Sequence, residues 1–343
     1  MRVLILGGTG FLGRYVVAHL HQLGHDIIIF HRGQTTADIP PSVTHIIGDR
    51  QHLADYADTF RQIAPDVVLD TIAYTEEQAQ AAMQLFTGVI PRLIALSSID
   101  VYWAYGRHHR SEDGPIDPRP LTEEAPLRQH LYTARGATPR QPDDPWRWLD
   151  DMEKILVERT VMNHSEIAGT ILRLPMVYGP GTWRLFAYLK RMDDQRPAIL
   201  LDERAAKWRG ARGYVENVAR AIALAVVEQH ARRRVYNIAE PEAFAEAEWV
   251  RQIGQVADWH GEIVRVPTGH LATPADPDQD WIVDSTRIRD ELGYTELISH
   301  SEALQRTIAW ERANPPEQIA SSWFGLDYAS EDQILAELNW QRS

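Results

Sequence analysis

Short apolar runs alternate with amphipathic stretches along the first half of the chain. Residues 3–6, 26–30, 43–47, 66–69 and 92–96 have the length and composition of buried strands. Between them, Leu12, Val16, Leu20 and Leu23 recur at helical spacing before Gly24, and residues 53–63 and 75–86 have helical patterns. Strands that alternate with helices at this spacing predict an α/β fold with a doubly wound parallel sheet and helices on both faces. Right-handed crossovers then place the carboxyl ends of the strands at one edge, where ligands bind.

The second half continues this pattern with longer interruptions. Strands are predicted at 172–176, 214–215 and 235–238, and helices at 182–192, 246–257, 284–292, 301–312 and 331–340. We therefore expect a sheet domain of residues 1–178 plus about 213–240, and a smaller, mostly C-terminal α/β domain of about 179–212 plus 241–314. Residues 315–343 form a tail with a short helix. Its Trp323, Phe324 and Tyr328 are expected to dock on the body of the protein or on a second subunit, which would make a homodimer.

Composition narrows the function classes. The 343 residues suit about two domains, and the absence of cysteine excludes disulfides, thiolate catalysis and cysteine-ligated zinc. No metal site is predicted. The net charge of −13 disfavours nucleic acids and anionic membranes as partners. The longest apolar run, 221–227, is far shorter than the roughly 20 residues that span a bilayer, and no export signal is visible, so we expect a cytoplasmic protein.

A glycine-rich turn joins the first strand to the first helix. Gly7, Gly10 and Gly13 surround Thr9, Phe11 and Leu12 in the stretch 7–13. The free N–H groups and the dipole of a helix N-terminus favour anions, and a β-carbon on the turn would hold a phosphate away. Strand, glycine turn and helix in this order predict a dinucleotide pyrophosphate site in a Rossmann fold.

The end of the second strand points to the kind of dinucleotide. In such a fold this position meets the adenine ribose, where an acidic residue binds the free hydroxyl of NAD and a basic one pairs with the 2′-phosphate of NADP. His31 and Arg32 stand there, followed by the hydrogen-bonding side chains of Gln34, Thr35 and Thr36. This favours NADP, with NAD as the alternative and a solvated Arg32 as the other interpretation. Asp49, after the third strand, either binds the adenine amino group or forms a turn.

Several strings of residues, in order, resemble one family. GGTGFLG at 7–13, SSIDVY at 97–102 and LRLPMVYGPG at 172–181 resemble the extended short-chain dehydrogenase/reductases, the NAD(P)-dependent epimerase/dehydratase group. The likeness extends through GYVENVARAIALAV at 213–226 and DSTRIRDELGY at 284–294, and covers residues 1 to about 312. The resemblance implies an NADP-dependent oxidoreductase or epimerase whose small-molecule substrate is a sugar, a sugar nucleotide or a similar carbonyl compound or polyol.

The resemblance also implies roles for particular residues. Ser98 would hydrogen-bond the reacting oxygen, and Lys154 would hold the nicotinamide ribose. The remaining predicted cofactor contacts are Gly7, Thr9, Gly10, Phe11, Leu12, Gly13, His31, Arg32, Asp49, Arg50, Thr71, Ala73, Ser97, Pro175 and Val177. Tyr102, Tyr132, Arg209 and Arg212 are predicted to bind the substrate, the arginines through phosphate oxygens.

One position departs from the family. Its proton-carrying Tyr lies four residues before the Lys on one helix face, but Asp150 stands there in this chain. Aspartate is ionised at pH 7 and cannot donate a proton, so Asp150 would act as a base or pair with Lys154 on a helix that Asp144 caps.

Other groups are candidate proton carriers. Asp100 holds the second place of the family's acid/base pair, and the long connection 103–148 carries Tyr105, His108, His109, His130 and Tyr132. Without such a group, the alternative is an NADP(H)-binding sensor or scaffold protein without redox turnover. A third hypothesis is RNA binding, because the chain resembles chloroplast stem-loop-binding relatives in the Arg-Gly ending of its second strand. The net charge of −13 counts against this hypothesis.

Overall fold

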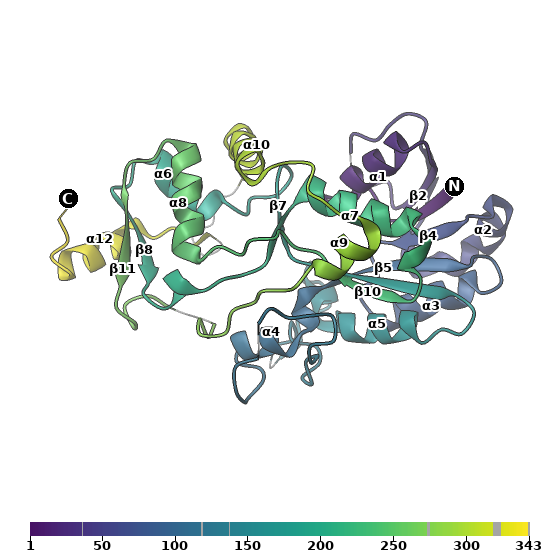
Figure 1. Cartoon of the computed structure of the whole chain (residues 1–343), viewed down its shortest axis with the longest axis horizontal. Coiled ribbons are helices and arrows are strands. Elements are labelled where there is room, and N and C mark those ends of the chain that lie inside the picture. Colours follow the sequence, from purple (N-terminus) through teal and green to yellow (C-terminus); the bar gives the residue numbers. More distant parts are fainter. Residues whose placement is uncertain (36, 118, 137, 273–274, 318–323, 342–343) are drawn as a thin grey trace.

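The computed structural model describes residues 1–35, 37–117, 119–136, 138–272, 275–317 and 324–341. Two residues named above, Thr36 and Trp323, lie outside the described residues. A parallel sheet of seven strands in the order β10-β6-β5-β4-β1-β2-β3 forms the larger part, and helices cover both of its faces (Figure 1). The predicted α/β class with a doubly wound sheet is confirmed. The strand order reverses between β1 and β4, which is where such folds bind ligands.

The elements of the sheet part follow the predicted alternation. In chain order they are β1 (Arg2–Leu6), α1 (Gly13–Gln22), β2 (Asp26–His31), β3 (Thr44–Ile47), η1 (Arg50–Tyr56), α2 (Ala57–Ile63), β4 (Val67–Asp70), α3 (Glu76–Phe86), β5 (Arg92–Ser98), η2 (Ile99–Val101), α4 (Trp103–His108), η3 (Arg147–Asp151), α5 (Lys154–Met162), β6 (Ala168–Leu174), α7 (Val215–Val227), η5 (Gln229–Ala231), β10 (Arg234–Asn237) and α9 (Thr286–Leu292).

Alternating side chains of the strands divide the core into two layers. Val3 and Ile5 of β1 face α1, α7 and α9, whereas Leu4 and Leu6 face α2, α3 and α5. A strand presents successive side chains to opposite faces, so a run that is apolar throughout is buried on both. This is why the unbroken run at 3–6 becomes a central strand.

The C-terminal part is smaller and has its own apolar core. It contains β7 (Met176–Tyr178), α6 (Phe186–Asp193), β8 (Ala198–Asp202), η4 (Ala205–Lys207), β9 (Arg212–Tyr214), α8 (Glu246–Ala257), β11 (Glu262–Val266) and α10 (His300–Ala313). β8 pairs with β11 and β7 with β9, both in parallel. The strand predicted at 172–176 is thus two strands, since Pro175 separates β6 from β7, and β11 was not predicted.

The tail docks on the same chain. Its helix α12 (Tyr328–Glu337) places Glu331 2.6 Å from Arg191, and the Tyr328 hydroxyl donates to Asp194 at 2.7 Å. The ring of Phe324 lies 4.8 Å from that of Phe186. These contacts correspond to the first of the two docking alternatives, and the homodimer stays a prediction. In the part of the chain described, no helix is long and apolar enough to cross a membrane.

The prediction that a helix begins after Asp144 is wrong. Asp144 accepts a hydrogen bond from the Trp146 amide at 2.7 Å and forms only a local turn, followed by the short helix η3. Met152 and Glu153 are extended, and the Glu153 carboxylate accepts from the Ile155 amide. Helix α5 therefore begins at Lys154, because Glu153 caps it there.

A chain of buried polar contacts fixes α5 to the sheet. Arg173 of β6 donates to both carboxylate oxygens of Glu158 at 2.7 and 3.0 Å, and Ser97 of β5 donates to the same carboxylate at 2.6 Å. Arg173 also donates to the hydroxyl of Tyr102, which donates to Asn237 of β10. Each donor is thereby paired, which buried charges require.

We expect Arg173→Met to lower the free energy of unfolding by about 3–5 kcal/mol, because Glu158 is left as a buried charge without its cation. Chemical denaturation at neutral pH measures this difference. Arg61→Met is the matched control: it breaks the exposed pair with Asp58 and should cost about 0–1 kcal/mol. Equal losses in the two variants would contradict the assigned role of the buried pair.

Candidate functional site

A cavity of about 820 Å³ runs along the carboxyl ends of β1, β2, β4 and β5. The glycine-rich turn forms one wall, and the residues after β2 and β3 form one end. Ser98, Lys154 and Pro175 lie at the other end. A second cavity of about 790 Å³ adjoins it and shares Thr9, Gly10, Phe11 and Thr35. Apart from Ala73, which is not among the described lining residues, the predicted cofactor residues thus come together from seven separate stretches of the chain, because parallel strands end at one edge.

The glycine-rich turn is shaped for close approach. Gly7 has φ +97°, and a β-carbon there would lie 2.3 Å from Thr71 Oγ1. Thr71 itself donates to the carbonyl of Leu6 at 2.8 Å, so it holds β4 against β1. A β-carbon on Gly13 would lie 2.7 Å from the backbone of Gly8, which brings α1 onto the turn. Backbone conformation and packing therefore require glycine at Gly7 and Gly13, whether or not a ligand binds.

The space beyond Gly10 is open and suits an anion. A β-carbon at Gly10 would meet no atom of a described residue within 4 Å. Helix α1 begins at Gly13 without a hydrogen bond from a capping side chain. The Arg14 and Tyr15 amides donate to the carbonyls of Gly10 and Leu12, whereas the Leu12 and Gly13 amides have no acceptor among the described residues and remain available as donors. An open cradle beside an uncapped helix N-terminus fits the pyrophosphate of a dinucleotide.

The residues after β2 and β3 divide into occupied and available groups. Arg32 is exposed, lines the cavity and pairs with no described residue. His31 lies 2.9 Å from His45 through their ring nitrogens. Arg50 makes a buried two-pronged ion pair with Asp70, at 2.6 Å for both contacts. Of the described cations after β2 and β3, Arg32 is therefore the available one, and Arg50 holds η1 against β4.

Asp49 forms a local turn, which is one of the two interpretations given for it above. Its carboxylate accepts from the Gln51 amide at 2.9 Å and caps η1, while the residue also lines the cavity. A carboxylate has several lone pairs, so this cap leaves room for a further contact. The adenine contact of Asp49 stays a prediction.

Lys154 lies at the inner end of the cavity and is 8% exposed. Its ammonium donates to the carbonyl of Ala73, after β4, at 2.6 Å and to that of Leu96, in β5, at 2.9 Å. Burial lowers the pKa of Lys154 to about 8, while the carboxylates of Asp70 and Asp100 oppose the shift. The lysine is thus held by backbone carbonyls of β5 and of the segment after β4.

The serines at the end of β5 differ in their surroundings. Both line the cavity, but the hydroxyl of the buried Ser97 donates to Glu158, whereas that of Ser98 accepts weakly from the Asp100 amide at 3.3 Å. Asp100 itself is not among the described residues that line the cavity, and its Oδ1 is buried without a partner there. Burial raises the pKa of Asp100, although the cations of Arg128 and Lys154 lower it.

Asp150 does not pair with Lys154. It belongs to η3 rather than to α5, and its carboxylate accepts from the Arg140 amide at 2.7 Å and forms an ion pair with the Arg140 guanidinium. The prediction that Asp150 and Lys154 share a helix face is wrong, because the helix begins after Asp150. The carboxylate instead fixes the end of the long connection.

The predicted substrate residues are already engaged with the protein. Tyr102 is fully buried in the polar chain described above, and Tyr132 has φ +57° with its ring against Arg135. Arg209 pairs with Asp280 at 2.9 Å, and Arg212 pairs with Glu246. None of the four lines the larger cavity among the described residues, so their contacts with a substrate stay predictions.

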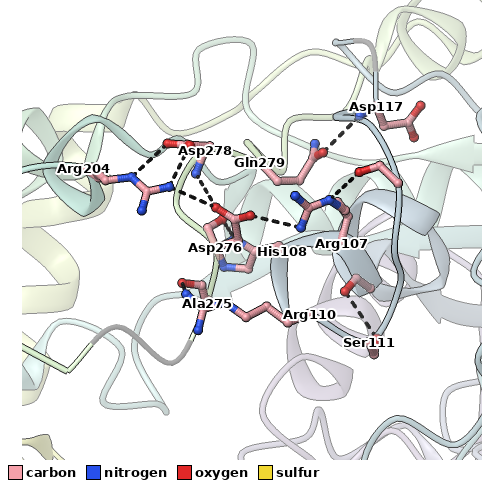
Figure 2. A network of polar contacts seen from close by, with 12 residues as sticks. Arg107, His108, Arg110, Ser111, Asp117, Arg204, Ala275, Asp276, Asp278 and Gln279 are labelled. Carbon is pink, nitrogen blue, oxygen red and sulfur yellow. Dashed lines mark hydrogen bonds and ion pairs between the residues drawn. The ribbon is translucent and has the colours of Figure 1, made fainter. Parts of the chain in front are cut away.

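The long connection is clamped to the C-terminal part by charges. Figure 2 shows the Asp276 carboxylate between Arg107 of α4 and Arg204, at 3.0 and 3.4 Å. The Asp117 amide donates to Gln279 at 3.0 Å in the same cluster. His109 lies outside the described cavity lining, and burial with its neighbour His108 lowers its pKa to about 4. These contacts hold the connection against the C-terminal part. Its histidines are not among the described residues that line the larger cavity.

Several lining residues were missed from the sequence. Tyr74, Gln78, Trp148, Thr182 and Arg184 all face the cavity. Tyr74 follows the fourth strand by four residues, so the rule that strand ends gather at one edge was a signal for it. Trp148 lies in the short helix η3 and Arg184 in the segment before α6, for which the sequence offered no such rule.

Comparisons with known proteins agree with this arrangement. Residues 3–110 match the model of the NAD dependent epimerase/dehydratase family. The chain is 22% identical to dTDP-glucose 4,6-dehydratase of Shigella flexneri, over 96% of this chain and 99% of the relative. The structure of dTDP-glucose 4,6-dehydratase from Bacillus anthracis in complex with NAD superposes with a TM-score of 0.65 at 17% identity, covering 94% and 98% of the two chains. That of UDP-glucose 4-epimerase from Thermotoga maritima with UDP-glucose gives 0.64 at 16% identity, covering 92% and 100%.

Two alanine substitutions in the turn should have different effects. Gly13→Ala forces its β-carbon against the Gly8 backbone and should lower the free energy of unfolding by about 1–3 kcal/mol. Gly10→Ala should leave the stability of the unliganded protein unchanged or raise it by up to about 1 kcal/mol. It should, however, reduce the thermal shift caused by NADH and NADPH. Thermal denaturation with and without dinucleotide measures both effects, and a full ligand response in Gly10→Ala would contradict the phosphate cradle.

Proposed function

We propose that the chain is a member of the NAD dependent epimerase/dehydratase family and an NAD(P)-dependent oxidoreductase or epimerase acting on a sugar nucleotide. A related sugar, carbonyl compound or polyol is the wider substrate class. The observation that carries this proposal is the single cavity that joins the uncapped start of α1 to Lys154 and Ser98. Its lining suits a dinucleotide whose reactive end lies beside these two side chains.

The residues of the chain have separable tasks in this proposal. The cofactor supplies hydride chemistry when bound. The Leu12 and Gly13 amides at the start of α1 hold its pyrophosphate, and Lys154, anchored by the carbonyls of Ala73 and Leu96, orients its ribose. Ser98 donates a hydrogen bond to the reacting oxygen of the substrate. The relatives support the substrate class, since one is named for dTDP-glucose and another was solved with UDP-glucose.

The choice between NADP and NAD rests on Arg32. An exposed guanidinium at the end of β2, with no ion pair to a described residue, suits a 2′-phosphate. No acidic side chain directly follows the strand to bind the free hydroxyl of NAD, because His31 and Arg32 stand there. NADP is therefore the proposed cofactor, and NAD, which is bound in the Bacillus anthracis relative, is the alternative.

One observation favours a second function. Asp150 replaces the family's tyrosine and is engaged by Arg140, so that position supplies no proton carrier. A protein that binds NADP(H) without turnover, as a sensor or scaffold, would need none. The two functions differ in whether a bound nicotinamide ever changes its redox state.

We expect NADPH to stabilise the protein against heat more than NADH does. Arg32→Ala should weaken NADPH binding about tenfold or more, from the loss of a charged hydrogen bond, and leave NADH binding unchanged. Titration calorimetry with both dinucleotides measures the two affinities, with Arg61→Ala as a control for loss of an exposed arginine. A wild-type preference for NADH would overturn the role given to Arg32.

Turnover separates the enzyme from the sensor. With sugar nucleotides, their keto derivatives and free sugars supplied in turn, we expect absorbance at 340 nm to change or an epimer to appear by NMR. Lys154→Met should abolish this turnover while the fold persists, because the variant loses the ribose contact. A wild-type protein that binds dinucleotide but converts no compound in a broad panel would favour the sensor.

A further inference from the structure

We propose that Tyr74 is the catalytic acid that donates a proton to the reacting carbonyl oxygen, in place of the missing family tyrosine. This inference rests on the proposed function, since it assumes reduction of a carbonyl by a nicotinamide. Tyr74 lies on the segment between β4 and α3, far in sequence from the position where the family carries its tyrosine.

The position of Tyr74 in the cavity carries the inference. It lines the same cavity as Ser98 and Lys154, and the Lys154 ammonium lies 4.6 Å from the centre of its ring. The residue immediately before it, Ala73, is the one whose carbonyl accepts from Lys154 at 2.6 Å. The phenol and the lysine are therefore neighbours through both side chain and backbone, although Tyr74 comes from a different element.

The backbone and the ring of Tyr74 are held in place. Its amide donates to Gln78 Oε1 at 2.8 Å, and its carbonyl accepts from the Glu153 amide, just before α5, at 2.9 Å. The ring packs against Trp148 with 4.9 Å between the ring centres. Its hydroxyl has no partner among the described residues, so it is available to a ligand. A group that is fixed but unpaired is preorganised for proton transfer.

No other described tyrosine meets these conditions. Tyr74 is the one tyrosine among the described residues that line the cavity. The hydroxyl of Tyr102 is used by Asn237 and Arg173. Tyr105 lies against Trp281 and His109, on the side of the long connection. Asp100, the carboxyl predicted as an alternative, is not among the described lining residues and keeps a buried oxygen away from the cavity.

The ionisation of the phenol fits an acid. Burial raises the pKa of Tyr74, the Asp70 carboxylate raises it further, and Arg50 opposes them. The hydroxyl is therefore protonated at neutral pH and ready to donate. In reduction, hydride from the reduced nicotinamide forms the new C–H bond and the C=O double bond becomes a single bond. The Tyr74 O–H bond breaks and the alcohol O–H bond forms.

The products of the step balance with the groups present. The carbonyl carbon is reduced by two electrons, the nicotinamide is oxidised, and the proton comes from Tyr74. The resulting phenolate lies beside the Lys154 ammonium, which stabilises it, and water then returns the proton. The reverse sequence oxidises an alcohol, with the Tyr74 phenolate as the base.

A spectroscopic measurement tests the position of Tyr74 without turnover. In full-length protein labelled with ¹³C at tyrosine Cζ, the resonance lost in Tyr74→Phe identifies Tyr74. Oxidised NADP should shift this resonance and lower the pKa of the phenol, because the positive nicotinamide ring lies beside it. Tyr328, whose hydroxyl bonds Asp194 on the distant tail, should show neither change. Dinucleotide binding, seen as a thermal shift, with an unchanged Tyr74 signal overturns the inference.

Kinetics then tests the chemical role. Tyr74→Phe should lower kcat for carbonyl reduction by at least about 100-fold and leave the affinity for NADPH unchanged. Tyr328→Phe removes a hydroxyl in the same way and should leave both unchanged. If wild type turns over and Tyr74→Phe keeps its kcat, the inference fails and the proposed function stands. If wild type binds NADPH but reduces no carbonyl, the proposed function fails and the inference with it.

Discussion

The buried ion pair between Glu158 and Arg173 is the constraint on which the site depends. It ties α5 to β6, and Ser97 joins β5 to the same carboxylate. Lys154 lies one turn earlier on α5, so its height above the strand ends follows from where this pair holds the helix. Two charges removed from water are tolerated only when each is fully paired, which makes the arrangement rigid.

The cavity is formed by backbone as much as by side chains. The turn at Gly7–Gly13 leaves the Leu12 and Gly13 amides without an acceptor among the described residues, and the carbonyls of Ala73 and Leu96 hold Lys154. Both sets of groups exist because parallel strands stop at a common edge. In the proposed function the backbone holds the pyrophosphate, whereas Arg32, Lys154 and Ser98 act through their side chains.

In the proposed function, different residues bind the dinucleotide and transfer the proton. The pyrophosphate cradle keeps the family's features, but Asp150 has become a structural partner of Arg140. Tyr74 lies on the segment after β4, so its phenol reaches Lys154 from a different element than α5. A proton carrier is required near the reacting atoms, and no rule of spacing along one helix is required. The proposed function is thus compatible with Asp150 at the position of the family's tyrosine.

The sequence by itself determined the sheet, the glycine turn and the residues at the strand ends, because periodicity and glycine placement act locally. It also located Lys154 and Ser98 through strings of neighbouring residues. Only the tertiary structure decided that α5 begins after Asp150, since the cap at Glu153 depends on contacts with Arg128 and the segment after β4. The same holds for Tyr74 and Arg50: whether a side chain meets a cavity or a buried carboxylate is settled by residues distant in the chain.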